Sequence, residues 1–548
     1  MGYEDYFFQP NFQNTILFQE MSQYLMSVVQ RMAAESRPTI QGREISYDSF
    51  LKNGQIPQEG KPWKMVFDEF MQLFQKAVVW QSPHAMINIT PPANIPSLLG
   101  AMYAALFNPN FGTDESAGFL MSTELYVIRN LAKLAGWNPL EAGGAFTFGG
   151  KGTALYGCKT GLRKVWPNCD DDGINAEEGL VFTDNKAHPC HSEVAAWLGL
   201  GKRQVVSLPT TPEGTVDLWA FEQQLDAALG QGKKIPCIFL NGGNTNEGYI
   251  DPIREIVAIR DRLVQKYHLH YRPHIHVDAV IGWVWLFFKD YNYDANPLNM
   301  TDSEKKRIHN NCAMISDLLF ADSFGADFHK TGFCPYVSSV FMVRKYAWLA
   351  PGKDFSNLMY GEYAPFGYTL ELSRSSNGPV AAYLAMELFG VDGFQKLIYQ
   401  VFHAGECIRS AIAQKSGFIL LNPKTCGFST LFLAVPPGLL AKNPEDILLN
   451  ADDCLIMADY NHQFYLYLDW KYELGELNTK ITFSKSYRPF GAPQKLGALK
   501  SFPMSPIIDD QQWYSCIEEI LCQKDSFDQS GIRYADDRRH PEDLVWRT

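Results

Sequence analysis

The sequence predicts an α/β protein built on a mostly parallel sheet that helices cover on both faces. Between about residues 96 and 344, short apolar runs of four residues alternate with helical segments. Alternation of this kind is typical of parallel strands joined by crossover helices. The chain has 548 residues, of which 46% are apolar and 20% charged. That composition is sufficient for a large buried core and argues against a disordered chain.

The elements of this central region follow one another in a regular order. The predicted strands are Leu180–Thr183, Val205–Leu208, Ile238–Asn241, His274–Val277 and Leu318–Ala321. Helices are expected between most of them, at Glu193–Leu200, Leu218–Leu229 and Pro252–Lys266. Ligands of such sheets bind beyond the carboxyl ends of the strands, so functional residues are expected there.

Two further regions flank the central one. Residues 1–95 are predicted to form a helical arm, with apolar residues at helical spacing between Ile16 and Val29 and a second helix near Phe67–Trp80. Residues 96–374 form the predicted large domain. Residues 375–548 open with a long helix and are predicted to form a smaller α/β domain. Its expected strands are Phe418–Leu421, Thr430–Ala434, Phe464–Trp470 and Lys480–Ser484.

The composition excludes several classes of protein. The net charge of −12 makes nucleic acid an unlikely partner, and no apolar stretch reaches the length of a membrane span. The acidic start MGYEDYFFQP does not resemble a secretory signal. Eleven scattered cysteines without a CxxC pair do not indicate a disulfide framework. We therefore expect a soluble, cytoplasmic protein that does not bind membranes.

A glycine-rich turn is the first candidate site. Residues 143–157, GGAFTFGGKGTALYG, open a predicted helix, whose free N–H groups suit a phosphate. The nucleotide-binding pattern GxxxxGK[ST] fails at Ala145 and Gly152. A tight turn with close helix packing explains the same glycines about equally well.

Asp278 and Lys330 lie near the ends of predicted strands. A carboxylate next to apolar surface, as in HIHVDAVIGW, needs a cationic partner. A partly buried lysine, as in ADSFGADFHKTG, can act as a nucleophile that forms Schiff bases. Taken singly, a capping aspartate and an exposed loop lysine are the commoner cases.

Histidines form the last candidate group. His188 and His191 follow the strand Leu180–Thr183, and His191 can place its ring across a flat ligand. A capped helix start or a zinc half-site are the alternatives. Zinc is disfavoured because the nearby histidines lack carboxylate or cysteine partners at ligand spacing; they are His268, His270, His274 and His276. No metal is therefore expected.

Together these groups match the needs of pyridoxal 5'-phosphate (PLP). The cofactor requires a lysine for its aldehyde, an anion for its pyridine nitrogen, donors for its phosphate and a flat face for its ring. Each feature alone is common, but the sequence has all of them in order at successive strand ends.

The sequence resembles the group II PLP-dependent amino-acid decarboxylases, the family of glutamate and aromatic-amino-acid decarboxylases. The matching segments, within about Trp80–Phe402, are FTFGGKGTALYG, AHPCHSEVAAWLGLG, NGGNTNEGYIDPI, HIHVDAVIGW, ADSFGADFHKTG and TLELSRSSNGPVAAYLAMELFG. The resemblance implies fold type I, the aspartate-aminotransferase-like fold of PLP-dependent transferases. A homodimer is expected for a separate reason, because the apolar helices of the arm lack enough partners of their own.

The resemblance assigns a role to each residue of the cofactor site. Lys330 forms the internal aldimine, Asp278 pairs with the pyridinium, His191 stacks on the ring and Val280 touches it. The phosphate is held by His329 and by the turn around Gly150 and Lys151, with Thr245 close to the cofactor. The chain departs from the family pattern at three positions, Lys151, Val280 and Phe328. The departure at Lys151 leaves open whether its side chain or only its backbone contacts the phosphate.

The implied reaction is decarboxylation of an L-amino acid to an amine and CO2 through a quinonoid intermediate, a carboxy-lyase activity. A loop tyrosine is expected to return the proton, with Tyr363 preferred to Tyr360 by its offset from Arg374.

Substrate binding is assigned to Asn88 and Arg374. Asn88 loosely favours an acidic amino acid over an aromatic one, although Met86 and Ile87 suit an apolar side chain. A carbon–carbon lyase, an aldehyde synthase or an aminotransferase on the same fold remain alternatives.

Overall fold

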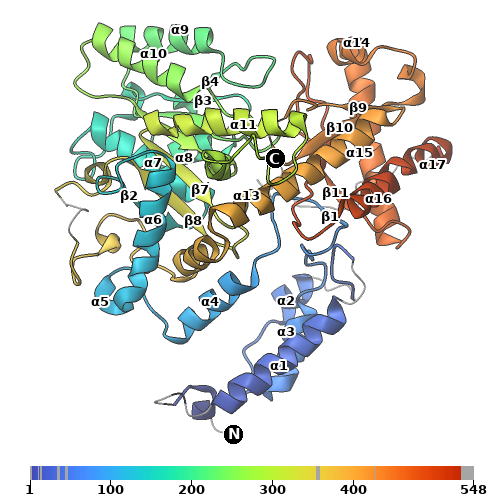
Figure 1. Cartoon of the computed structure of the whole chain (residues 1–548), viewed down its shortest axis with the longest axis horizontal. Helices are drawn as coiled ribbons and strands as arrows, with labels where there is room; N and C mark the ends of the chain where they lie inside the picture. The colour runs from blue at the N-terminus through green and yellow to red at the C-terminus, as the bar shows by residue number, and fades with distance from the viewer. Residues whose placement is uncertain are drawn as a thin grey trace.

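The computed structural model describes residues 3–9, 12, 15–33, 37–42, 47–352, 358–425 and 427–531. This part of the chain contains a helical arm, a seven-stranded sheet and a five-stranded sheet (Figure 1).

The seven-stranded sheet is mostly parallel, as the sequence predicts. Its order is β2-β8-β7-β6-β5-β3-β4, and β8 runs antiparallel to both of its neighbours. The strands are β2 (Gly143–Thr147), β3 (Val181–Asp184), β4 (Val205–Leu208), β5 (Cys237–Asn241), β6 (His274–Asp278), β7 (Ser323–Asp327) and β8 (Ser339–Val343). Every strand except the edge strand β4 is almost completely buried, so helices must cover both faces.

Helices and their caps follow from local sequence. Asp217 caps α9, and Thr301 with Glu304 forms a capping box at the start of α11. Helix α7 lies tightly against the sheet, where a Cβ at Gly157 would lie 2.4 Å from a ring nitrogen of His276. The main helices of this domain are α6 (Ser122–Leu134), α7 (Gly150–Val165), α8 (Cys190–Trp197), α9 (Leu218–Gly230), α10 (Ile253–Lys266) and α11 (Asp302–Ser316). Its short helices are α5 (Asp114–Ala117), α12 (Tyr346–Leu349) and the 3-10 turns Gly118–Met121, Ala176–Glu178, Lys202–Gln204, Gly282–Phe288 and Pro365–Gly367.

Two predicted strands are wrong. Leu318–Ala321 falls mostly in a 3-10 helix, Asp317–Phe320, and the strand is the following Ser323–Asp327. Phe464–Trp470 lies inside a helix, Ala451–Glu473. In both cases a short run of apolar and aromatic residues fits a strand and a buried helical turn equally well, and tertiary packing decides.

The five-stranded sheet belongs to the C-terminal region. Its order is β1-β11-β12-β10-β9, with β1 (Ala85–Met86), β9 (Phe418–Leu420), β10 (Thr430–Ala434), β11 (Lys480–Phe483) and β12 (Leu499–Ser501). Helix α13 (Asn377–Gln414) leads into it, followed by α14 (Pro444–Leu449), α15 (Ala451–Glu473), α16 (Asp510–Leu521) and α17 (Gln523–Ser530). Because β1 pairs with β11, residues 85–86 contribute to this sheet rather than only to the arm. The predicted boundaries at 95 and 374 stay a prediction.

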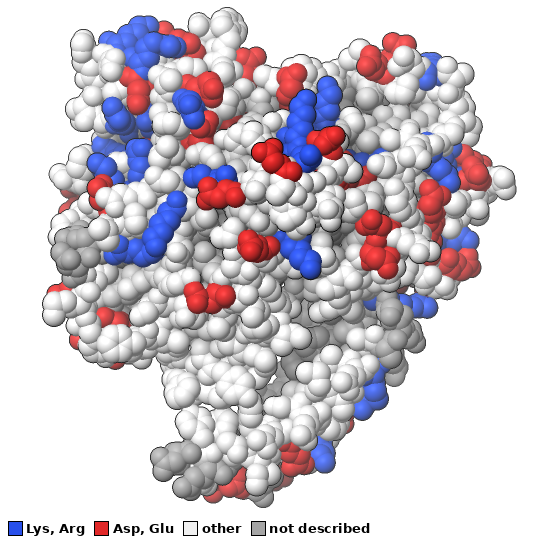
Figure 2. Space-filling view, in the orientation of Figure 1, with Lys and Arg blue, Asp and Glu red and all other residues white. Residues whose placement is uncertain are grey.

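The N-terminal arm projects from the body of the molecule (Figure 1). It begins with the 3-10 turn Tyr3–Tyr6 and contains α1 (Thr15–Met32), α2 (Tyr47–Asn53) and α3 (Trp63–Gln72). Helix α4 (Ile95–Leu106) then packs against α13. Among the described residues, none of the helices is both long and apolar enough to cross a membrane. Lysine and arginine side chains are interspersed with acidic ones on the face shown in Figure 2.

Candidate active site

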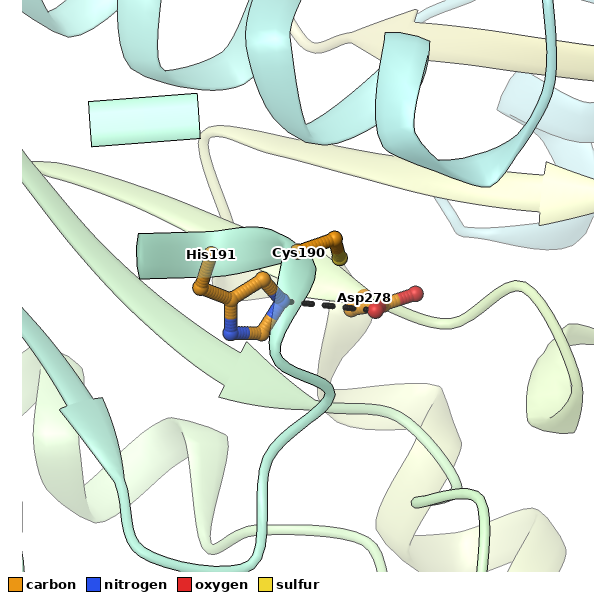
Figure 3. A group of neighbouring side chains, drawn as sticks. All are labelled: Cys190, His191 and Asp278. Atoms are coloured by element: carbon orange, nitrogen blue, oxygen red, sulfur yellow. Dashed lines mark hydrogen bonds and ion pairs between the residues drawn. The ribbon is translucent and has the colours of Figure 1, made fainter. Parts of the chain in front are cut away.

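His191 and Asp278 form the centre of the site. His191 lies in the first turn of α8 and Asp278 ends β6, so the parallel sheet brings both to one edge. His191 Nε2 lies 3.3 Å from Asp278 Oδ2 (Figure 3), and its Nδ1 lies 2.9 Å from Thr183 Oγ1. The imidazole is 1% exposed. The structure therefore brings together two residues that are 87 positions apart in the sequence.

The His191 ring is also fixed by stacking. Its centroid lies 4.3 Å from that of Phe239, with an angle of 7° between the planes. Since Phe239 on β5 covers one face of the imidazole, a flat ligand can stack only on the opposite face.

The environment of Asp278 keeps its carboxylate charged. Burial alone would raise the pKa of Asp278, but the hydrogen bond and charge of His191, together with the charge of Lys330, hold it well below its usual range. A buried carboxylate of this kind is suited to pair with a cationic ring nitrogen.

Lys330 pairs with a second buried carboxylate. Its Nζ lies 2.8 Å from Asp327 Oδ2, and the Asp327 side chain is fully buried at the end of β7. Asp327 Oδ1 accepts a hydrogen bond from Ser339 Oγ at 2.5 Å. Burial would lower the pKa of Lys330, but Asp327 and the charge of Asp278 raise it above the ordinary value. Sequence analysis missed Asp327, although a strand-end aspartate three residues before a lysine was a usable signal.

The predicted phosphate turn opens α7 next to this lysine. Gly149 has a φ of 122°, and α7 begins at Gly150. A Cβ at Gly150 would lie 3.1 Å from Asp327 Oδ2 and 3.3 Å from Val280 Cγ1. The first residue of α7 therefore lies next to Val280 and to Asp327, the ion-pair partner of Lys330. Lys151 points to Glu193 and forms an ion pair with it, so phosphate contact by its side chain stays a prediction.

His329 is buried beside the same groups. Its Nδ1 accepts a hydrogen bond from the backbone N–H of Ser338 at 3.2 Å, so Nε2 carries the hydrogen when the ring is neutral. Nε2 lies 3.4 Å from Asp327 Oδ2. Burial lowers the pKa of His329, which favours the neutral ring.

Tyr363 and Arg374 lie in a different buried cluster. The Tyr363 hydroxyl donates to Glu124 at 3.0 Å, and Arg374 donates to both oxygens of Glu124 and to the backbone oxygens of Phe111 and Phe146. Tyr363 is 2% exposed, whereas Tyr360 is 58% exposed and packs on Phe119. Arg374 therefore has an internal partner rather than a free guanidinium for substrate. The role of Tyr363 as a loop donor stays a prediction, and this placement favours Tyr360 instead.

We expect the Tyr360→Phe and Tyr363→Phe variants to lose different properties, the first turnover and the second stability. Tyr360→Phe should lower turnover by about 10²-fold, as for loss of a general acid, with unchanged thermal stability. Tyr363→Phe should mainly lower the free energy of unfolding, by about 1–3 kcal/mol, because it removes a buried hydrogen bond to Glu124. Steady-state rates and thermal unfolding measure both effects. Full turnover in Tyr360→Phe with loss of turnover in a stable Tyr363→Phe would restore the original assignment.

A large pocket lies between the domain of the seven-stranded sheet and the domain of the five-stranded sheet. It has a volume of about 850 Å³ and brings together residues from the N-terminal segment, the large domain and the C-terminal domain. Asn88, His188 and Thr245 line it, as do Thr482 and Lys500 of the five-stranded sheet. The predicted substrate residue Asn88 thus lies in one cavity with the predicted cofactor residue Thr245.

The geometry at the centre of the site would also permit a metal ion. Ligand atoms of Cys190, His191 and Asp278 lie within 4.8 Å of one another (Figure 3). Burial raises the pKa of the Cys190 thiol well above its usual range, which opposes the thiolate that a metal prefers. His274 and His276 are buried on β6, and both hydrogen bond with Ser323 Oγ, at 2.7 and 2.8 Å. The expectation that no metal is used stays a prediction.

The chain is similar to known proteins over most of its length. Residues 46–431, more than half of the chain, match the family model described as the pyridoxal-dependent decarboxylase conserved domain. The chain is 23% identical over 362 residues to an L-aspartate decarboxylase of Metarhizium robertsii, covering 65% of this chain and 67% of that one. It is 24% identical over 356 residues to an L-2,4-diaminobutyrate decarboxylase of Rhizobium meliloti, covering 64% of each. These matches span about two thirds of the relatives' lengths. Mouse CSAD in its apo form has the same fold, with a TM-score of 0.75, 18% identity, and coverage of 92% of this chain and 99% of that one.

Proposed function

The chain belongs to the pyridoxal-dependent decarboxylase family, and on this basis we propose that it releases CO2 from an L-amino acid and leaves the corresponding amine. The observation that carries the proposal is the presence of two ion pairs at the ends of the neighbouring strands β6 and β7. They are His191 with Asp278 and Lys330 with Asp327. The first pair offers a charged carboxylate beside an imidazole ring, and the second offers a partly buried amine.

The residues present fit PLP, the cofactor of this family. Lys330 would hold its aldehyde carbon, Asp278 its pyridine nitrogen, His191 one face of its ring and Val280 the other. The start of α7 at Gly150 and the His329 ring would hold its phosphate. When bound, PLP supplies an electron sink for the electron pair left by the departing carboxylate.

The protein's own groups would then control protons and water. Asp278 would keep a proton on the cofactor's ring nitrogen, because its own pKa is held well below the usual range and its carboxylate stays charged. Phe239 and Thr183 fix the plane of His191, so the ring need not reorganise during the reaction. Tyr360 would supply a proton to the substrate's α-carbon from the loop.

The relatives' names leave the substrate open. Aspartate and 2,4-diaminobutyrate carry side chains of opposite charge, and an acidic substrate is the choice that Asn88 favoured. The experiment that tests the function is CO2 release with added PLP across the twenty amino acids plus cysteine sulfinate, DOPA and diaminobutyrate. Oxygen consumption, a keto-acid requirement or an aldehyde product without CO2 would instead indicate an aldehyde synthase, an aminotransferase or a carbon–carbon lyase.

We further propose a cytoplasmic homodimer. The ten cysteines that the structure describes are all free thiols, as expected in a reducing compartment. Large apolar side chains are exposed along α4 and the arm, including Tyr47 at 87%, Leu51 at 82% and Tyr103 at 54%. The surface over α4 carries few charges in Figure 2. A second subunit would bury these side chains.

Charged substitutions on these surfaces should therefore dissociate the dimer. Leu51→Glu combined with Tyr103→Glu is expected to shift the mass measured by analytical ultracentrifugation from about twice 62.0 kDa toward 62.0 kDa. Trp219→Glu is the matched control, since Trp219 is 73% exposed on α9. A wild-type monomer at all concentrations that still turned over would contradict the proposal.

A further inference from the structure

A second group of possible metal ligands lies away from the reaction site, where α13 meets α16. His403 and Cys407 lie one turn apart on α13, and Asp510 is the first residue of α16. His403 Nε2 lies 3.1 Å from Asp510 Oδ2 and 3.7 Å from Cys407 Sγ. One ligand atom from each of these residues lies within 4.8 Å of the other two. None of the three is among the described residues that line the pocket between the domains.

The distances match the edges of a tetrahedral zinc site. Zinc binds an imidazole nitrogen at about 2.0–2.1 Å, a carboxylate oxygen at about 2.0–2.2 Å and a thiolate sulfur at about 2.3 Å. In a tetrahedron with those bond lengths, the nitrogen lies about 3.4 Å from the oxygen and about 3.6 Å from the sulfur. The corresponding distances in the structure are 3.1 and 3.7 Å. One ion can therefore fit between the three side chains with little movement.

A fourth side chain, that of Glu304, orients the imidazole. Glu304 lies on α11 and is buried, and its Oε1 forms a hydrogen bond with His403 Nδ1. Its other oxygen accepts hydrogen bonds from the backbone N–H and the hydroxyl of Thr301, each at 2.8 Å. A histidine that binds a metal usually donates its second ring N–H to a carboxylate, which fixes the ring. Glu304 occupies this position, and the opposite nitrogen faces Cys407 and Asp510.

The charge and the accessibility of the group also suit a cation. Hydrogen bonds to Cys407 and to Glu304 raise the pKa of His403 to about 11, so the imidazole carries a second proton when no metal is bound. A zinc ion would replace that proton at Nε2 and the thiol proton of Cys407. The side chains of His403 and Asp510 are 31% and 57% exposed, which leaves the ion a path from solvent.

We propose that His403, Cys407 and Asp510 bind a zinc ion, with water as the fourth ligand, and that this ion links α13 to the start of α16. Glu304 acts as a positioning residue and extends the link to α11 of the large domain. The proposal is independent of the decarboxylase function, because none of these residues belongs to the proposed reaction site. The expectation that no metal is used would then hold only for the reaction.

The first test measures zinc binding to the full-length, cofactor-loaded protein by competition with a chromophoric chelator. The wild type should bind one zinc ion per chain. Cys407→Ser should weaken binding by more than the roughly 10–100-fold that is typical for loss of an outer-shell partner. Cys522→Ser is the matched control, because Cys522 is an exposed free cysteine outside the group, and its affinity should equal that of the wild type. Equal affinity in the wild type and Cys407→Ser, or no zinc binding at all, would overturn the proposal.

The second test uses cobalt(II) in place of zinc to identify the ligands. A tetrahedral site with a thiolate ligand gives cobalt strong visible bands and a sulfur-to-metal charge-transfer band. Difference spectra against the zinc-loaded protein cancel the absorbance of the cofactor. Cys407→Ser should lose the charge-transfer band, whereas Cys190→Ser should keep it. The opposite result would place the metal at the group of Cys190, His191 and Asp278 in Figure 3 and would overturn the proposal.

Two further variants test the contacts with substitutions that the fold should tolerate. Asp510 is exposed and α16 keeps its cap, Asp509, so Asp510→Asn should fold normally and still bind zinc more weakly. Glu304→Gln can keep the capping box with Thr301 and should weaken binding by about 10–100-fold. Zinc should raise the melting temperature of the wild type but not that of Cys407→Ser. Unchanged zinc affinity in Asp510→Asn and Glu304→Gln would overturn the proposed ligand set.

Discussion

Replacing Lys330 with alanine should abolish turnover, with a loss of about four orders of magnitude or more, the size seen when a covalent nucleophile is removed. The amine is positioned at the end of β7 by its 2.8 Å contact with Asp327, and no other lysine shares that environment in the described structure. Borohydride reduction of the wild-type holoenzyme should fix the cofactor to Lys330. Peptide mapping and the visible absorbance of the protein measure this directly.

The control for Lys330→Ala is a lysine of the same sequence region outside the site. Lys345 precedes α12, and Lys345→Ala should keep both colour and turnover. A reduced cofactor on any lysine other than Lys330 would show that the assignment is wrong. The assignment would also be wrong if the Lys330→Ala variant stayed coloured because the cofactor was bound covalently to another residue.

Replacing Asp278 with asparagine should lower turnover by about 10³-fold while the fold stays intact. The substitution keeps the shape but removes the charge that faces His191 and would hold a proton on the cofactor nitrogen. Leaving one member of a buried ion pair without its partner costs about 3–5 kcal/mol, and each ~1.4 kcal/mol is a factor of ten in rate. Single-turnover kinetics and the absorbance of the bound cofactor report the change.

Asp322 provides a matched control for a buried, paired aspartate. It precedes β7 and lies 2.8 Å from Arg260 Nη1 and 3.0 Å from Arg344 Nη2. Asp322→Asn should lower the melting temperature without changing the cofactor spectrum. Near-normal turnover in Asp278→Asn would contradict its role, whatever its effect on stability.

The fold class was predictable because buried parallel strands have a strong sequence signature. Val205–Leu208 is a strand with the bounds that the sequence predicts, and the strand predicted at His274–Val277 extends one residue further. The antiparallel β8 was missed, since its direction depends on pairing with β2 and β7 rather than on composition. The error at Phe464–Trp470 also arises because tertiary packing is not visible in a short segment. A run of aromatic residues indicates that the segment is buried but does not distinguish a strand from a helix.

The placement of a candidate residue was predictable where its neighbours in the sequence reveal its position in the sheet. Asp278 and Lys330 follow strands, so their location at one edge of the sheet follows from topology. Lys500 gave no such signal, because its hydrogen-bond acceptors Thr245 and Asn246 are more than 250 positions away, in the turn that follows β5. The burial of Tyr363 was equally hidden, since it depends on Glu124 in α6.

The ion pair between Asp327 and Lys330 has a consequence for the newly made protein. A lysine reacts with aldehydes only through its uncharged amine, and Asp327 holds this one in the charged form. Sugars and other carbonyl compounds of the cell therefore meet a poorly reactive group before the cofactor arrives. A cofactor held by its phosphate and ring would stay in the site long enough to react with the small fraction of uncharged amine. A sugar that does not bind the site would leave before it reacts. The ion pair would therefore slow glycation of Lys330, the lysine that we propose holds the cofactor.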